Sequence, residues 1–144
     1  MKGFTLIELL VVMGVIVILI GIGIPAFRNY QPNLQLSGAT RNLISDIRYV
    51  QQLAVAEQIG YGIKLIATTN EYQIIKYGVP EEVIKEKQLP SGISFLEIIG
   101  LDENQVIFNP YGAVRESGSI TLTNIQNTTE RIDIRPSGFV RIIK

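Results

Sequence analysis

The chain contains no cysteine and no histidine among its 144 residues. Without cysteine it has no disulfides, no thiolate zinc sites and no cysteine nucleophile. Without histidine it has no serine–histidine relay, no imidazole metal ligand and no side chain whose unperturbed pKa lies near neutrality. The residue types therefore favour a non-enzymatic protein, and we predict no catalytic residue, no metal site and no cofactor.

The chain also lacks an excess of either charge, since lysine plus arginine and aspartate plus glutamate number 13 each. The overall charge gives no long-range attraction for nucleic acid or for an anionic membrane. The C-terminus differs, because four basic residues follow residue 130 against the single acid Asp133: Arg131, Arg135, Arg141 and Lys144. Strand alternation predicts that Arg131, Asp133 and Arg135 share one face, and that Phe139 and Arg141 share a face of the next strand.

A long apolar run begins close to the N-terminus. From Phe4 to Ile24 only Thr5 and Glu8 are polar. As a helix this run extends about 31 Å, which matches the hydrocarbon core of a bilayer, about 30 Å thick. We predict that it spans a membrane.

Three interpretations of this run lead to different mature proteins: a secretory signal removed after the run, an uncleaved anchor, or a leader cut before the run. A secretory signal has a shorter apolar core and gains nothing from Glu8. A carboxylate in a bilayer costs at least about 2.5 to 3.5 kcal/mol, unless it reaches the interface or finds a partner. Cleavage after Gly3 places a new amine on Phe4, four residues before Glu8 and on the same helical face.

The stretch Lys2–Val12 resembles the leader of type IV prepilins and pseudopilins. The resemblance implies cleavage after Gly3 by a membrane prepilin peptidase and N-methylation of Phe4. It also implies that Glu8 is attracted to the terminus of an adjacent subunit during assembly, and that Pro25 is a helix-bending proline.

A second helical pattern follows the apolar run. Pro32 is expected to interrupt or kink the helix. From about Leu34 to Gln58 apolar residues recur at three-to-four spacing, and Gly60 is a predicted stop. The stripe is predicted to pack on the sheets of the domain rather than on a coiled-coil partner: Leu36, Leu43, Ile47, Val50 and Ala54.

Beyond Gly60 short strand-like runs alternate with turn residues, which favours an antiparallel β sandwich or two-sheet domain. The first two runs form a hairpin-like pair. We predict eight strands, at residues 61–67, 72–77, 83–89, 93–99, 105–108, 119–123, 131–134 and 139–143. The acidic pairs Glu81–Glu82 and Asp102–Glu103 fall in polar, turn-like sequence and are predicted to be solvated.

The segments Phe108–Gly112, Ile120–Leu122 and Ile134–Arg141 resemble the C-terminal part of GspH/FimT-type pseudopilins. The resemblance implies a long N-terminal helix on two β sheets. It also implies service as a minor component of a type II secretion pseudopilus or a type IV pilus.

We therefore predict an α+β, pilin-like fold, with a long N-terminal helix packed on an antiparallel two-sheet β domain. The helix has a transmembrane half and an amphipathic half. The expected organisation is a leader peptide at 1–3, a transmembrane and filament-core helix at 4–30, an amphipathic helix at 31–60 and the β domain at 61–144.

The expected location is the bacterial inner membrane, crossed once, with the β domain on the periplasmic or extracellular side before incorporation into a pseudopilus or pilus. Expected partners are other pilin-like subunits, the prepilin peptidase and an assembly platform.

One alternative is a FimT-like minor pilin that contacts DNA through the C-terminal basic residues. FimT-like tails carry glycine-arginine-x-arginine, whereas this chain has Gly138-Phe139-Val140-Arg141. The other alternative is a membrane-anchored binding module that does not polymerise.

Overall fold

The computed structural model describes residues 3–143, apart from the side chains of residues 25 and 26. Three residues named above lie outside this range: Met1 and Lys2 of the predicted leader, and Lys144 of the basic C-terminus. The chain divides into two compact units, with the boundary after Pro32. Each unit is described by itself.

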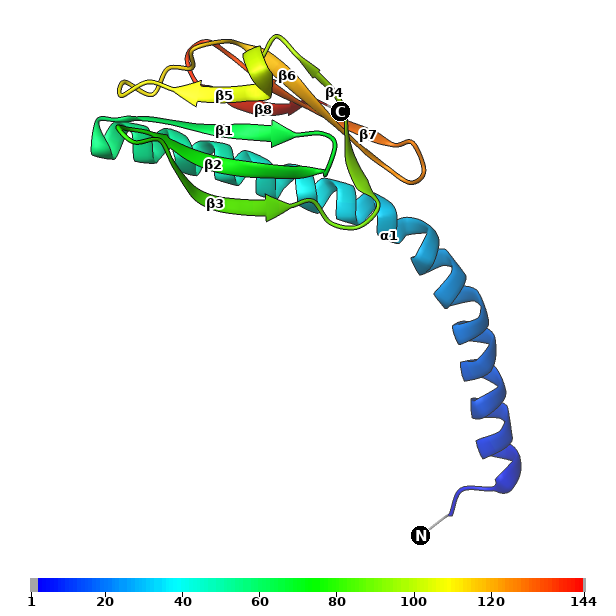
Figure 1. Cartoon of the computed structure of the whole chain (residues 1–144). Helices are drawn as coiled ribbons and strands as arrows, with labels where there is room; N and C mark the ends of the chain where they lie inside the picture. The colour runs from blue at the N-terminus through cyan, green and yellow to red at the C-terminus, as the bar shows by residue number, and fades with distance from the viewer. Residues whose placement is uncertain (1–2, 144) are drawn as a thin grey trace. The chain divides into compact units, whose positions relative to one another are not determined.

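A single helix, α1 (Leu6–Glu57), forms the N-terminal unit and continues into the second unit (Figure 1). Pro32 was predicted to interrupt or kink the helix. An interruption is wrong, because the helix continues through that residue, and a kink stays a prediction. A proline removes only its own N–H donor, so the turns on either side keep their hydrogen bonds. The predicted stop at Gly60 is also wrong. The helix ends at Glu57, Gln58 adopts the left-handed φ of 55°, and Gly60 already belongs to a strand.

The first part of α1 is apolar and exposed. A stretch of 19 residues, Leu6–Ile24, is long and apolar enough to cross a membrane, and none of it is buried. Its large aliphatic side chains are all exposed. The length and composition of this stretch therefore agree with the predicted transmembrane half.

The second part of α1 buries one face against the β domain. All five residues of the predicted apolar stripe are buried, at 1% exposure or less. They join one hydrophobic core with buried side chains of both sheets, such as Ile63, Phe108, Ile120 and Ile132. The prediction that the stripe packs on the sheets is confirmed.

Eight strands form two antiparallel four-stranded sheets, so all eight predicted strands are present within a residue or two of their expected ends. One sheet has the order β3-β2-β1-β5, with β1 (Gly60–Ile66), β2 (Glu71–Tyr77), β3 (Glu82–Gln88) and β5 (Gln105–Phe108). The other has the order β4-β6-β7-β8, with β4 (Ile93–Ile99), β6 (Gly118–Asn124), β7 (Thr129–Ile134) and β8 (Val140–Ile143). The predicted hairpin is β1–β2, paired from Gly60↔Tyr77 to Ile66↔Glu71.

Candidate functional site

The predicted processing site lies at the start of α1. Gly3, Phe4 and Thr5 precede the helix, and the Phe4 side chain is 86% exposed. No atom lies within 4 Å of where a Cβ on Gly3 would be. The peptide bond between Gly3 and Phe4 therefore precedes the hydrogen-bonded helix, and both residues are exposed.

Glu8 is held by Thr5, a residue to which the sequence analysis gave no role. The Thr5 backbone N–H and the Thr5 hydroxyl each donate to Glu8 Oε2 at 2.9 Å, and the Glu8 N–H donates to Thr5 Oγ1 at 3.3 Å. This reciprocal arrangement is a capping box, in which Thr and Glu three residues apart satisfy free N–H groups at a helix start. The Thr-x-x-Glu spacing of Thr5 and Glu8 is a signal for this cap in the sequence itself.

Pro25, the predicted bending residue, lies within α1, and residues 21–25 are helical. Gly14, Gly21 and Gly23 have open space where a Cβ would stand. These three glycines therefore present bare backbone along the apolar segment, which is the surface that closely packed membrane helices use.

The basic residues near the C-terminus lie where strand alternation placed them. Asp133 pairs across the strands with Arg141, and Ile132 and Ile134 point into the core on the opposite face. Asp133 Oδ2 lies 3.4 Å from Arg141 Nε and 3.7 Å from Arg135 Nε. Asp133 therefore offsets part of the positive charge of this surface.

The two turn segments that carry the pseudopilin resemblance meet over α1. Gln51 of the helix donates a 2.7 Å hydrogen bond to the Gly112 carbonyl. Gly138 has a φ of +79°, and a Cβ there would stand 2.2 Å from the Gly112 carbonyl oxygen and 2.3 Å from Gln51 Nε2. Glycine is thus required at 138 both by the backbone angle and by the close approach of another backbone.

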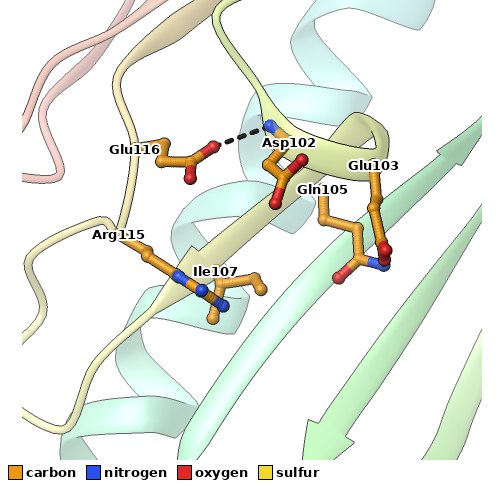
Figure 2. A pocket seen from close by; sticks show the side chains of 6 residues that line it. All are labelled: Asp102, Glu103, Gln105, Ile107, Arg115 and Glu116. Carbon is orange, nitrogen blue, oxygen red and sulfur yellow. Dashed lines mark hydrogen bonds between the residues drawn. The ribbon is translucent and has the colours of Figure 1, made fainter.

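A hollow of about 200 Å³ lies beside β5 and the short helix η1 (Asp102–Asn104) (Figure 2). Asp102, Glu103, Glu116 and Arg115 line it, and a Glu116 carboxylate oxygen accepts a hydrogen bond from the Asp102 N–H at 2.7 Å. Residues of both predicted solvated pairs are exposed, as expected. Within residues 3–143, no cluster of three acidic residues has the geometry to hold a metal ion.

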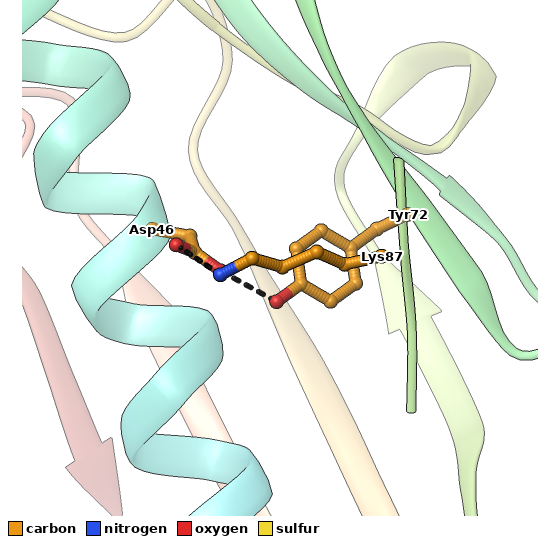
Figure 3. Close-up of polar contacts among 3 residues, drawn as sticks. All are labelled: Asp46, Tyr72 and Lys87. Atoms are coloured by element: carbon orange, nitrogen blue, oxygen red, sulfur yellow. Dashed lines mark hydrogen bonds and ion pairs between the residues drawn. The ribbon is translucent and has the colours of Figure 1, made fainter. Parts of the chain in front are cut away.

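A second polar cluster joins α1 to β2 and β3 (Figure 3). The Asp46 carboxylate accepts a hydrogen bond from the Tyr72 hydroxyl. It also forms an ion pair with Lys87, whose Nζ lies 2.6 Å from Asp46 Oδ2. Burial, followed by the hydrogen bond to Asp46 and its charge, holds the pKa of the Tyr72 phenol well above its usual value. The cluster fixes the helix on the sheet, and each of its polar groups has a partner.

Comparison with known proteins identifies the family. The profile described as type II transport protein GspH matches residues 39–138, and the prokaryotic N-terminal methylation motif matches residues 1–24. The chain belongs to the GspH family. Members of this family are pseudopilins, which are structural subunits and not enzymes. The resemblance found in the sequence is therefore confirmed.

The GspH-family chain is also similar to individual proteins. Over 29 residues it is 69% identical to the prepilin peptidase-dependent protein D of Escherichia coli (strain K12), a match that spans 20% of this chain and only 20% of that protein.

Two solved structures share the fold. The minor pseudopilin EpsH from the type 2 secretion system of Vibrio cholerae gives a TM-score of 0.66 at 10% identity, covering 76% of this chain and 96% of that one. The type IV minor pilin FimU of Pseudomonas aeruginosa gives 0.65 at 10% identity, covering 80% and 92%. At this identity the two structures show the fold alone, which is the predicted pilin-like helix on two antiparallel sheets.

Proposed function

We propose that the chain is a minor pseudopilin of a type II secretion system, processed at its N-terminus and incorporated into a pseudopilus through α1. The observation that carries the proposal is the pairing of two matches on one chain, the methylation motif at residues 1–24 and the GspH profile at residues 39–138. The motif covers the apolar stretch, and the profile covers the packed domain. EpsH and FimU match equally well, so the fold alone does not choose between secretion and pili, whereas the profile favours secretion.

In this proposal residues 1–3 are a leader, and prepilin peptidase cleaves between Gly3 and Phe4. A peptidase needs an extended, accessible peptide bond. The bond precedes the helix, and the Phe4 side chain beside it is exposed. Cleavage leaves an α-amino group on Phe4, which becomes the site of N-methylation. The helix start at Leu6 remains intact.

Glu8 is the proposed assembly residue. Its carboxylate is already held at the first turn of α1 by Thr5, close to where the new amine forms. An opposite charge brought to this carboxylate in apolar surroundings interacts more strongly than in water, because the dielectric constant is lower. We propose that the amine of a neighbouring subunit supplies that charge. Pro25 and the glycines before it form the proposed weak point of the helix within the filament.

The proposed location follows from the same helix. Leu6–Ile24 crosses the inner membrane once, and the β domain lies on the periplasmic side until the subunit is extracted into the pseudopilus. Extraction exchanges lipid for neighbouring apolar helices, so the exposed aliphatic surface avoids lasting contact with water. The proposed partners are other pseudopilins, the prepilin peptidase and the assembly platform.

Intact mass spectrometry of protein purified from its native membrane tests the processing step. We expect a mass that lacks residues 1–3 and includes one methyl group on Phe4. A native protein that retains Met1, or that has lost the whole apolar stretch, contradicts the proposal.

Replacing Glu8 tests the assembly step. Glu8→Ala is expected to leave the amount of membrane-inserted protein unchanged and to reduce its recovery in sheared pseudopili by at least about ten-fold. Removing the acid leaves the amine of a neighbouring subunit unpaired in apolar surroundings, and an unpaired buried charge costs several kcal/mol. Glu82→Ala, which removes an exposed carboxylate of β3, is the matched control. Normal recovery of Glu8→Ala in pseudopili rules out the assigned role.

The DNA-binding alternative stays a second prediction. Of the predicted contact residues, Arg135 and Arg141 lie beside Asp133, Arg131 is exposed, and Lys144 lies outside the described residues. A gel shift at low and moderate salt tests it, since phosphate contacts weaken steeply as salt rises.

The anchored module that does not polymerise is tested by crosslinking in cells. Crosslinks to other pilin-like subunits exclude it.

A further inference from the structure

A groove runs along the second half of α1, between the helix and β8. It consists of two adjoining hollows of about 440 and 390 Å³. Arg48, Phe139 and Val140 line both hollows, so the two are continuous. We call this surface the α1–β8 groove. It reaches from Arg41 to Gln52 along the helix.

The α1–β8 groove is basic. Three arginines line it, Arg41, Arg48 and Arg141, and none of its lining residues is acidic. Arg41 and Arg48 have no acidic residue three or four positions away on the helix, so the usual intrahelical pairing is unavailable to them. Within residues 3–143, neither forms an ion pair, and Arg48 instead donates to the Val140 carbonyl at 3.1 Å.

Several other basic side chains of the domain have carboxylates near them. Arg135 lies beside Asp133, and Arg115 lines the same hollow as Asp102, Glu103 and Glu116 (Figure 2). Lys76 and Lys87 pair with Glu57 and Asp46, respectively. The two uncompensated arginines of the groove therefore mark a place suited to a negative partner.

The shape of the groove suits a short extended chain. The helix rises about 16 Å from Arg41 to Gln52, which equals about five residues of extended polypeptide. At Val140 of the edge strand β8, the carbonyl already accepts a hydrogen bond from Arg48, which opposes the addition of a further strand there. A guest is therefore held through its side chains.

The groove also offers apolar contacts. Ile44 of α1 and Ile142 of β8 line it between the arginines. Phe139 is 54% exposed at the point where the two hollows join. A partly exposed aromatic ring beside arginines is the composition found at binding hot spots.

We propose that the α1–β8 groove docks an extended acidic segment of a partner protein, about five residues long. Carboxylates of the segment pair with Arg41 and Arg48, and an apolar side chain packs against Phe139. The proposal names a surface that the processing and helix-assembly steps do not use. It can therefore fail while the proposed function holds, and the reverse is also true.

Fluorescence anisotropy with the full processed chain in neutral detergent micelles tests the proposal. The probe is a labelled six-residue peptide of alternating glutamate and leucine, compared with the same peptide carrying lysine in place of glutamate. We expect the acidic peptide to bind, the basic peptide not to bind, and the affinity to fall as salt is added because exposed charges are screened. No binding of the acidic peptide overturns the proposal.

Substitutions locate the binding. The Arg41 side chain is exposed. Arg41→Gln is therefore expected to weaken binding of the acidic peptide about three-fold and Arg41→Glu about ten-fold, without changing thermal unfolding. Phe139→Ala is expected to weaken binding of the acidic peptide about three-fold. Arg115→Gln removes one arginine charge from the hollow of Figure 2 and serves as the matched control for Arg41→Gln. Equal effects of Arg41→Gln and Arg115→Gln overturn the proposal, since they show a general charge effect.

Two further measurements separate other occupants. The first uses a labelled single-stranded oligonucleotide. If it binds more tightly than the acidic peptide, and if Arg41→Glu lowers its affinity about ten-fold, the groove is a nucleic-acid site and the proposal is overturned. Self-association of the chain that competes with the peptide and is lost in Arg41→Glu also overturns it, because the occupant is then a second copy. If neither tighter oligonucleotide binding nor competing self-association is observed and the acidic peptide binds, the result supports a segment of a partner protein.

Discussion

The two units of this chain use the same aliphatic residues for opposite purposes. In the N-terminal unit, Ile16 and its neighbours are exposed all around the helix. In the second unit, Ile47 lies on the same helix but is fully buried against the sheets. The difference teaches that hydrophobicity alone does not predict burial within a chain. A helix that is apolar on every side needs lipid or other helices, whereas a helix with one apolar stripe needs its own domain.

The largest test of this difference compares two identical substitutions. Ile47→Ala is expected to lower the free energy of unfolding of the β domain by about 2 to 5 kcal/mol, because it removes buried methyl groups and leaves a cavity. Ile16→Ala is expected to change that free energy by less than about 0.5 kcal/mol, because the side chain is exposed. Denaturant unfolding of both variants in neutral micelles measures the two values. Equal losses contradict the division into two independent units.

A second test compares two glycines. Gly138→Ala is expected to destabilise the domain by about 2 kcal/mol or more, since alanine is strained at φ +79° and its Cβ meets the Gly112 carbonyl. Gly14→Ala adds the same methyl group in open space, and the domain should unfold as in the parent protein. Thermal unfolding of both variants provides the measurement. A fully stable Gly138→Ala protein shows that the backbone contact over Gln51 is unimportant.

The smallest expected effect concerns pH. The raised pKa of Tyr72 means that above about pH 10 the unfolded chain loses its phenol proton while the folded chain keeps it. Stability is therefore fully present below pH 10 and falls as pH rises, by about 1 kcal/mol at pH 11. Tyr72→Phe should flatten this decline, whereas Tyr30→Phe, which changes an exposed side chain of the N-terminal unit, should not. Denaturant unfolding at pH 8 to 11 gives the slopes, and a Tyr72→Phe protein with the parent slope contradicts the assignment.

Much of the fold could be predicted because its signals are local. Each strand alternates or is bounded by turn residues, and all eight were found. The apolar stripe from Leu36 to Ala54 repeats every three to four residues, so its burial was predictable. The ends and breaks of the helix could not be predicted in this way, because a proline lowers the stability of a helix without necessarily ending it. Pro32 lies inside α1. Gln58, rather than Gly60, takes the left-handed conformation after the end of α1.

The candidate sites divide in the same way. Gly3, Phe4 and Glu8 were named from a contiguous motif, and Thr5 was readable at capping-box spacing, because a helix start involves only neighbouring residues. The α1–β8 groove was not predictable. Phe139 follows Arg41 by 98 positions and Arg48 by 91 positions, and nothing in either segment indicates that they lie together.

The sequence by itself determined that this chain has an apolar segment able to cross a membrane, a processing motif before it and an eight-stranded domain after it, since each depends on residues near one another. Only the tertiary structure decided which arginines remain without a carboxylate and which turns meet at Gln51. Those outcomes depend on the order of strands in each sheet and on where α1 lies against them. Contacts between distant segments set both, and sequence periodicity does not record such contacts.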